Sequence, residues 1–371
     1  MKQLSLQEVL EGIEDTRRER SVWYPLYEVL FIMLTAVICG ATSYAKVEMF
    51  GKSKERWLKK YIKLENGVPD ACTFRNVIKA IDTQQLHTVF LEWMRSIVEN
   101  VTGVVAIDGK QARRTKDAKK PPLHVVSAFS AECGLVLGQL ACEEKSNEIT
   151  AIPELLDKIQ VKGQVVTIDA MGTQTAIAEK IRKKRADYVL ALKGNQGNLH
   201  EDVKLYLQDS EVKQALRTSG QYKRTVEKAR SQIEIREYYQ TENISWLTCK
   251  REWKGLKSVG MEEKTIRKGG LEKKEYRFFI SSLQEDIELF SRAVRGHWSV
   301  ESMHWHLDVT FREDANQTLD RQAAQNLNII RKWCLSILKV IELFRPNLSM
   351  KKKRFIISMN PPEFLDQLLA F

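Results

Sequence analysis

The sequence predicts a mixed α/β protein, in which an all-helical N-terminal domain precedes a helix-covered mixed sheet that a β-rich insertion interrupts. Three observations support this prediction. Apolar residues recur at helical spacing through residues 1–98. Short β-branched segments alternate with amphipathic ones over residues 99–220. Strand-like alternation dominates residues 221–284, and helical spacing returns over residues 285–345, before a basic C-terminal tail at 346–371.

The composition favours a soluble protein with an anionic partner. The 371 residues include 59 Lys and Arg against 48 Asp and Glu, a formal net charge of +11, which is typical of nucleic-acid binding. The six cysteines form no C-x-x-C pair and indicate a reducing cytoplasm rather than a zinc ribbon. The apolar segment 29–41 is shorter than the ~20 residues of a membrane span. We therefore expect a cytoplasmic protein, nucleoid-associated when bound to DNA, with no membrane contact.

Residues 1–98 are expected to form a series of helices. Leu6, Val9 and Leu10 begin the helical spacing, segment 29–41 predicts a buried helix, and Asp70 starts the amphipathic helix of ACTFRNVIKA. A helical unit of this kind suits either the binding of DNA ends or dimerisation, and helicity alone does not distinguish the two. If it binds DNA, the helix that starts near Asp70 is the candidate for reading bases.

The sheet is expected to begin with three antiparallel strands, in VVAID, LHVVSAFSA and GLVLGQLACEE, the last two joined by a hairpin turn. A helix, a strand in QVVTID, a second helix and a strand in ADYVLALK follow along the chain. In a sheet built in this order, the first and fourth strands can lie side by side.

Two aspartates follow apolar strands at the points where those strands end. Asp108 closes VVAID before a glycine, and Asp169 closes VVTID before a tight turn. A polar residue at such a strand end lies in the crevice where α/β sheets bind ligands. Two neighbouring carboxylates repel each other unless a cation lies between them, and their hard oxygen ligands suit Mg²⁺ or Mn²⁺. The alternative, for either residue alone, is a cap on the turn that follows.

A third carboxylate, Glu301, lies in the segment RAVRGHWSVESMHWHLDVTFRED. Burying it on an aromatic helix face requires a partner or a metal, and the two aspartates are the expected counterpart. A zinc site through His297, His304 and His306 is the weaker alternative, because it lacks the H-E-x-x-H order. At helical steps of three and four, Glu301 shares its face with Val294, His297, Trp298, His304, Trp305 and Asp308.

With these motifs the chain resembles the ISAs-type transposases, the group that includes the H-repeat-associated proteins of bacterial genomes. The resemblance covers almost the entire length. It implies an RNase H-like catalytic core with a DDE triad, matched by Asp108, Asp169 and Glu301, that holds two Mg²⁺ or Mn²⁺ ions per active site. The matching stretches include GVPDACTFRNV, VVAIDGKQARR, HVVSAFSAECGLVLGQLACEEKSNEITAIPELL, VVTIDAMGTQTAIAEKI, ADYVLALKGNQGNLHEDV, YRFFISSL and VRGHWSVESMHWHLDVTFRED.

The function that this resemblance implies is that of a DNA transposase of an insertion sequence, which binds element ends and catalyses metal-dependent strand cleavage and strand transfer. Its partners would be double-stranded DNA, both terminal inverted repeats and target, and it would act as a homodimer or a larger assembly. Two alternatives stay open: an RNase H-like nuclease without strand transfer, and a domesticated DNA-binding protein that has lost catalysis.

The sequence departs from one pattern around the glutamate. Related DDE transposases often carry Y-x2-R-x3-E-x6-K there, and this chain has Val294, His297 and Asp308 at the Tyr, Arg and Lys positions. Arg295, His297 and Lys110 are the expected substitutes.

Basic runs beside both aspartate strands, at residues 110–120 and 180–193, are expected to follow the DNA backbone. Trp253, in the β-rich insertion, either stacks on a displaced base or packs that insertion. The expected DNA contacts are Lys110, Arg113, Arg114, Lys193, Asn195, Gln196, Trp253, Arg295, His297 and Trp298.

Overall fold

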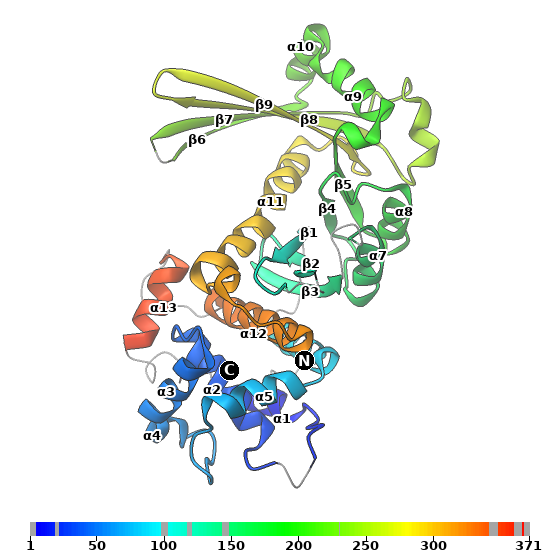
Figure 1. The fold of residues 1–371 in the computed structure, drawn as a ribbon. Coiled ribbons are helices and arrows are strands. Elements are labelled where there is room, and N and C mark those ends of the chain that lie inside the picture. Colours follow the sequence, from blue (N-terminus) through cyan, green and yellow to red (C-terminus); the bar gives the residue numbers. More distant parts are fainter. Residues whose placement is uncertain are drawn as a thin grey trace.

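The computed structural model describes residues 5–18, 22–97, 103–116, 121–142, 148–229, 231–340, 348–359 and 366. Within these residues one nine-stranded sheet organises the molecule, with helices on both of its faces (Figure 1). Its strands lie in the order β3 (Leu135–Cys142), β2 (Leu123–Ser130), β1 (Val104–Ala112), β4 (Val165–Ile168), β5 (Asp187–Leu192), β9 (Leu271–Ser281), β8 (Ser258–Lys268), β7 (Gln232–Thr241) and β6 (Tyr222–Ala229).

The first five strands form one half of the sheet. β1, β2 and β3 are antiparallel, while β4 lies parallel to β1 and β5 lies parallel to β4. Ile107 and Ile168 are partners across β1 and β4, so the next residue of each strand, an aspartate, lies at the same edge of the sheet. The predicted mixed α/β fold is confirmed, as is the pairing of the first and fourth strands.

The β-rich insertion extends this sheet rather than forming a second one. β6 to β9 are antiparallel hairpins, and β9 pairs with β5 from Val189–Ser281 to Leu192–Phe278. The far ends of these strands project beyond the helices (Figure 1). Two helices precede the insertion, α9 (Asn198–Gln208) and α10 (Ser210–Thr218), and sequence periodicity did not separate them from the core.

Helices cover both faces of the sheet. α7 (Glu148–Lys158) and α8 (Thr175–Lys183) pack on one face. On the other face, α11 (Ile287–Trp305) crosses β1 and β4 and buries Val294 in the same apolar cluster as Val104 and Val165, while Phe290 packs against Phe279 of β9. A π-helical turn at His306–Thr310 ends α11, and α12 (Arg321–Val340) follows.

The N-terminal helices are α1 (Leu6–Glu11), α2 (Leu26–Ile38), α3 (Tyr44–Ser53), α4 (Glu55–Leu58), α5 (Ala71–Ala80) and α6 (Thr83–Ile97). The predicted start of α5 is confirmed, because Asp70 caps it through a 2.6 Å hydrogen bond from the Thr73 amide. The segment that was expected to be a buried helix is α2, whose residues are almost all buried. No helix in the described part of the chain is long and apolar enough to cross a membrane.

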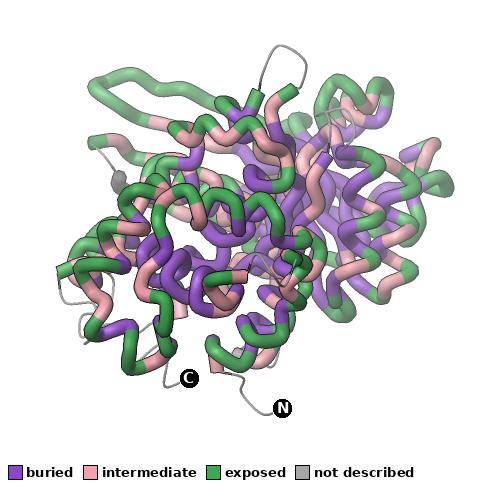
Figure 2. Tube along the Cα trace, turned by 60° about the horizontal axis from the view of Figure 1, so that its bottom comes forward, coloured by how far each residue is buried: buried purple, intermediate pink, exposed green. Residues whose placement is uncertain are grey.

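These N-terminal helices share one apolar core with α12. The ring of Trp333 lies 5.5 Å from Phe90 and 5.8 Å from Trp93, and the Asn326 amide donates to the carbonyls of Ile78 and Ile81 at 2.9 Å each. Figure 2 shows the buried residues gathered in the interior beneath exposed helix faces. The helical region is therefore packed around a helix from the far end of the chain.

Part of the expected basic C-terminal tail is a packed helix, α13 (Met350–Met359). Arg354, within the basic KKKR run, is buried and donates to the carbonyls of Val37 (2.6 Å) and Ile38 (3.3 Å) at the end of α2. These residues of the basic tail are therefore packed, because this guanidinium satisfies the terminal carbonyls of a buried helix. Positions 346–347, 360–365 and 367–371 of the tail lie outside the described residues.

Candidate active site

The two aspartates lie on neighbouring parallel strands, at the edge where a loop follows β4. Asp108 is a residue of β1, and its Oδ1 accepts a hydrogen bond from the Gly109 amide at 2.9 Å. Asp169 follows β4, and its Oδ1 accepts from the amides of Met171 (3.1 Å) and Gly172 (3.2 Å). The tight turn after VVTID therefore fixes one oxygen of Asp169 and leaves the other for a ligand.

The electrostatics of Asp108 are those of a crowded carboxylate. Burial raises its pKa to about 7, and the negative charges of Asp169, Glu148 and Glu301 add to that shift. Carboxylates held this close repel each other, and a cation between them would remove the repulsion.

Glu301 projects from α11 into a pocket of about 160 Å³ that Asp169 also lines. It is exposed rather than buried, so the expected burial on an aromatic face is wrong. The buried face of α11 also contains fewer residues than predicted, because Trp305 is 52% exposed. Although the residue is exposed, surrounding atoms shield its carboxylate in part from water and raise the pKa of Glu301, and the cations of Arg277 and Lys193 oppose that shift. The same pocket includes Thr167, His297 and Trp298.

The residues fit divalent ions by donor chemistry. Asp108, Asp169 and Glu301 offer carboxylate oxygens, which Mg²⁺ and Mn²⁺ prefer. The raised pKa of Asp108 is due first to burial and then to the charges of its acidic neighbours, and a bound cation would offset both. Among the described residues no three His, Cys, Asp or Glu side chains lie close enough together to hold a metal. The three carboxylates therefore lie in one region of the structure, but they are not close enough together to coordinate one ion.

The zinc alternative is not supported by the geometry. His297 Nδ1 lies 3.1 Å from Thr167 Oγ1, and His306 Nδ1 lies 3.3 Å from Thr310 Oγ1, whereas His304 Nδ1 lies 3.6 Å from Asp108 Oδ2. Each ring faces a different partner. Burial lowers the pKa of His297 to about 4, so its ring is neutral at physiological pH.

A buried pair beneath Asp108 was missed by sequence reasoning. His124 of β2 and Glu148 at the start of α7 are both buried, and His124 Nε2 lies 2.5 Å from Glu148 Oε1. The pair crowds the backbone of Gly109, because a Cβ added there would overlap both side chains. Its sequence signal is a polar residue in each of two otherwise apolar faces, LHVV and NEITAI.

Replacing Gly109 with alanine is expected to destabilise the protein by about 1–3 kcal/mol, since the new methyl must displace the His124–Glu148 pair from a packed site. Urea unfolding of the full chain measures this. Gly194→Ala is the control, because no atom lies within 4 Å of its added Cβ. Equal free energies of unfolding for the two variants would contradict the close packing described here.

Lys110 is not free to bind a phosphate, which corrects one expected DNA contact. Its Nζ lies 2.7 Å from Asp308 Oδ1 and 3.0 Å from Glu313 Oε2, and its side chain is 10% exposed. Although burial lowers the pKa of Lys110, these carboxylates raise it overall. Asp308, at the position where related transposases have a lysine, is one of its partners. Lys110 therefore binds β1 to the segment after α11.

Several other expected DNA contacts also have partners within the protein. The amide groups of Asn195 and Gln196 donate to Ala170 O (2.8 Å) and Thr173 O (2.7 Å), so they brace the loop that carries Asp169. Trp253 is 5% exposed and lies in the apolar core of the α7–α8 face. It therefore packs the fold, and the base-stacking alternative is wrong.

The remaining expected DNA contacts differ in their exposure to solvent and in whether they are paired within the protein. Arg113 is 80% exposed with Asp314 at 3.7 Å, and Arg114 and Lys193 are exposed. Arg295 is paired with Glu227 at 3.3 Å. Trp298 lies beneath the guanidinium of Arg277, at 4.2 Å from ring centroid to Cζ. Of the basic run 110–120, residues 117–120 lie outside the described residues.

A lysine from α12 supports the sheet next to Asp108. Lys332 Nζ donates to Ser127 Oγ (2.7 Å) and Gln139 Oε1 (2.8 Å), and Ser127 is the cross-strand partner of Asp108. Burial lowers the pKa of Lys332 to about 7.

This lysine predicts a pH dependence of stability. Between about pH 7 and pH 10 the unfolded chain binds a proton at Lys332 that the folded chain has lost, so the free energy of unfolding rises with pH, by at most about 1.4 kcal/mol per pH unit. Lys332→Met is expected to remove this rise. Urea unfolding of both proteins at pH 7, 8 and 9 tests it, and parallel curves for the two would refute it.

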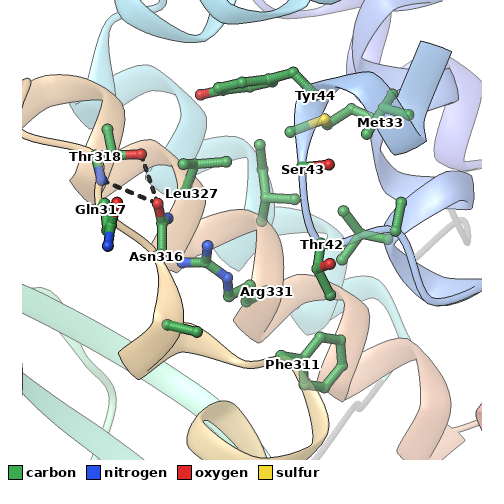
Figure 3. A pocket seen from close by; sticks show the side chains of 15 residues that line it. Met33, Thr42, Ser43, Tyr44, Phe311, Asn316, Gln317, Thr318, Leu327 and Arg331 are labelled. Carbon is green, nitrogen blue, oxygen red and sulfur yellow. Dashed lines mark hydrogen bonds between the residues drawn. The ribbon is translucent and has the colours of Figure 1, made fainter. Parts of the chain in front are cut away.

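A second pocket, of about 330 Å³, shares no lining residue with the pocket of Asp169 and Glu301. Figure 3 shows the side chains that line it. It opens between Tyr44, at the start of α3, and the segment that links α11 to α12. There the Asn316 side chain accepts hydrogen bonds from the amide and hydroxyl of Thr318. This pocket contains none of the predicted site residues.

The fold and the carboxylate site together define a class of protein. Residues 99–337 match the family described as Transposase DDE domain, and residues 7–94 match the family described as DDE_Tnp_1-associated. The chain therefore belongs to the transposases with a DDE domain.

Individual relatives agree with this assignment. YncI of Escherichia coli O157:H7 is 38% identical over 380 residues, which cover 99% of this chain and 94% of that protein. The H repeat-associated protein YhhI of E. coli strain K12 is 36% identical over 374 residues, covering 98% and 97%. The resemblance to the H-repeat-associated transposases is thereby confirmed. A solved piggyBac transposase synaptic complex with hairpin DNA aligns at a TM-score of 0.43 and 9% identity, over 99% of this chain and 77% of that one.

Proposed function

We propose that this chain is the DNA transposase of an insertion sequence, which binds the terminal inverted repeats of its element and catalyses metal-dependent strand cleavage and strand transfer. The observation that carries this proposal is the placement of Asp108 and Asp169 on adjacent parallel strands, with Glu301 projecting into the pocket that Asp169 lines.

In this proposal the protein's residues position charge rather than form covalent bonds. Two Mg²⁺ or Mn²⁺ ions bound by Asp108, Asp169 and Glu301 would supply activation of a water or 3′-hydroxyl and neutralisation of the leaving oxygen. Asp169 is held in register by its turn amides. The loop beneath it is braced by Asn195 and Gln196, which keeps the carboxylate edge rigid.

DNA binding is proposed along the exposed cations that border this edge. Arg113, Arg114 and Lys193 supply phosphate contacts. In the N-terminal helices, α5 presents an exposed face with Arg75, Asn76 and Lys79 opposite its buried one, which suits reading of the element ends. Two copies or a larger assembly would hold the paired ends and the target DNA.

The test uses the full chain and the DNA that flanks its own gene. Nuclease footprinting is expected to show protection at the element ends, and incubation with Mg²⁺ or Mn²⁺ is expected to cut a strand there. A joining assay with precleaved ends then measures strand transfer. Cleavage without joining would identify a nuclease instead, and protection without cleavage would identify a DNA-binding protein that lacks catalysis.

A further inference from the structure

Arg277, a residue of β9, enters the active-site pocket from the β-rich insertion. It lines that pocket together with Asp169, Lys193 and Glu301. Neither the spacing around Glu301 nor the basic runs of the sequence point to it, since it lies in the strand segment YRFFISSL. It reaches the pocket because β9 pairs with β5, whose far end leads into Lys193.

Two neighbours hold the Arg277 guanidinium in place. Glu262, its cross-strand partner on β8, accepts a 3.1 Å hydrogen bond from Nη1, and the ring of Trp298 lies 4.2 Å from Cζ. Glu262 is 1% exposed, so its carboxylate has little freedom to move. A guanidinium that is stacked on an indole and bonded on one side loses little entropy when it binds an anion.

The contact with Glu262 leaves part of the Arg277 guanidinium available to a ligand. The same carboxylate also lies 3.5 Å from Arg236 Nε, although Arg236 is hydrogen-bonded to Glu227 and Glu234 instead. Arg277 has five N–H donors, and within the described chain Glu262 is the acceptor to which it is bonded. Its side chain is 33% exposed, which leaves donors facing the pocket.

Of the other cations near the triad, Lys110 and Arg295 are already paired with carboxylates, whereas Lys193 is open to a ligand. Lys110 is held by Asp308 and Glu313, and Arg295 is paired with Glu227. Lys193 is exposed and makes no ion pair with any residue that the structure describes. Arg277 and Lys193 are thus the two cations that share a pocket with Asp169 and Glu301.

We infer that Arg277 and Lys193 form a binding subsite for the phosphodiester that is cut, with Glu262 and Trp298 as positioning residues for Arg277. This inference rests on the proposed function and adds to it the residue that receives the phosphate. A planar guanidinium matches two phosphate oxygens, so Arg277 has the geometry to receive the phosphate.

The experiment measures binding of the full chain to a fluorescent duplex that carries the footprinted end sequence, with Ca²⁺ in place of Mg²⁺. Single methylphosphonates, which remove one phosphate charge, are scanned across the end. Wild-type protein is expected to lose about tenfold in affinity at one position, as for a charge-assisted contact. Arg277→Gln is expected to bind about tenfold more weakly and to be insensitive to that same methylphosphonate.

Two further variants exclude a general effect on folding. Arg267→Gln, an exposed arginine in the same hairpin that pairs with Glu272, should keep the wild-type sensitivity. Arg277→Lys, which keeps the charge beside Glu262, should retain part of it, with an unchanged melting temperature. If Arg277→Gln and Arg277→Lys both respond to every methylphosphonate as the wild type does, the subsite is refuted. Cleavage in Mg²⁺ is scored separately, so a subsite without cleavage would refute the proposed catalysis alone.

Discussion

Replacing Asp169 with asparagine is expected to slow metal-dependent cleavage of end DNA by about 10³-fold or more, because the amide keeps the shape of the side chain and loses the charge that binds a divalent ion. Its Oδ1 can still accept the hydrogen bonds of Met171 and Gly172, so the turn should stay folded. Single-turnover cleavage and duplex affinity, measured on the same preparation, separate chemistry from binding.

The matched control for this variant is Asp157→Asn. Asp157 lies on α7, is exposed and is paired with Lys180 at 2.6 Å, so its charge contributes little to activity or stability. It should cleave as the wild type does. Undiminished cleavage by Asp169→Asn would show that the reaction centre is elsewhere.

Replacing Glu313 with alanine is expected to destabilise the protein by about 3–5 kcal/mol, because it removes the counter-charge of the buried Arg331 and one of the counter-charges of Lys110. Glu313 is 2% exposed and lies 3.0 Å from Lys110 Nζ and 3.3 Å from Arg331 Nη1. Burial alone would raise the pKa of Glu313, but the charges of these cations outweigh that effect and lower the pKa to about 2. The stabilisation is thus complete above pH ~4.5 and is lost as pH falls towards 2.

Urea unfolding at pH 7 measures this loss. Glu272→Ala, which removes an exposed carboxylate from its pair with Arg267, should change the free energy of unfolding by less than about 1 kcal/mol. Similar values for the two variants would mean that the buried network around Lys110 contributes nothing beyond an ordinary surface pair.

The parts of the fold that could be predicted are those that local sequence encodes. Asp169 could be placed because it follows a β-branched run and precedes a turn, and strand order made β1 and β4 neighbours. The expected strand end at Asp108 was wrong, because β1 continues through Asp108 to Ala112. The start of α5 was equally local, since Asp70 caps it within three residues.

What could not be predicted depends on partners that are distant in sequence. Lys110 looked like part of a basic run, but its partners Asp308 and Glu313 come about 200 residues later and neutralise it. Arg277 reaches the pocket only because the insertion pairs with β5. A run of basic residues in the sequence gives the charge of a segment. Whether that charge is available to a ligand depends on the ion pairs that form in the folded protein.

The core that α12 shares with the N-terminal helices limits how the proposed DNA specificity of this transposase could change. A chimaera joined near residue 98 would set foreign helices against Trp333 and Asn326, which contact α5 and α6 directly. Exchange of the helical region as a block would therefore have to carry α12 with it. If the outward face of α5 reads the element ends as proposed, recognition would instead diverge one substitution at a time on such faces, while the shared interior is inherited unchanged.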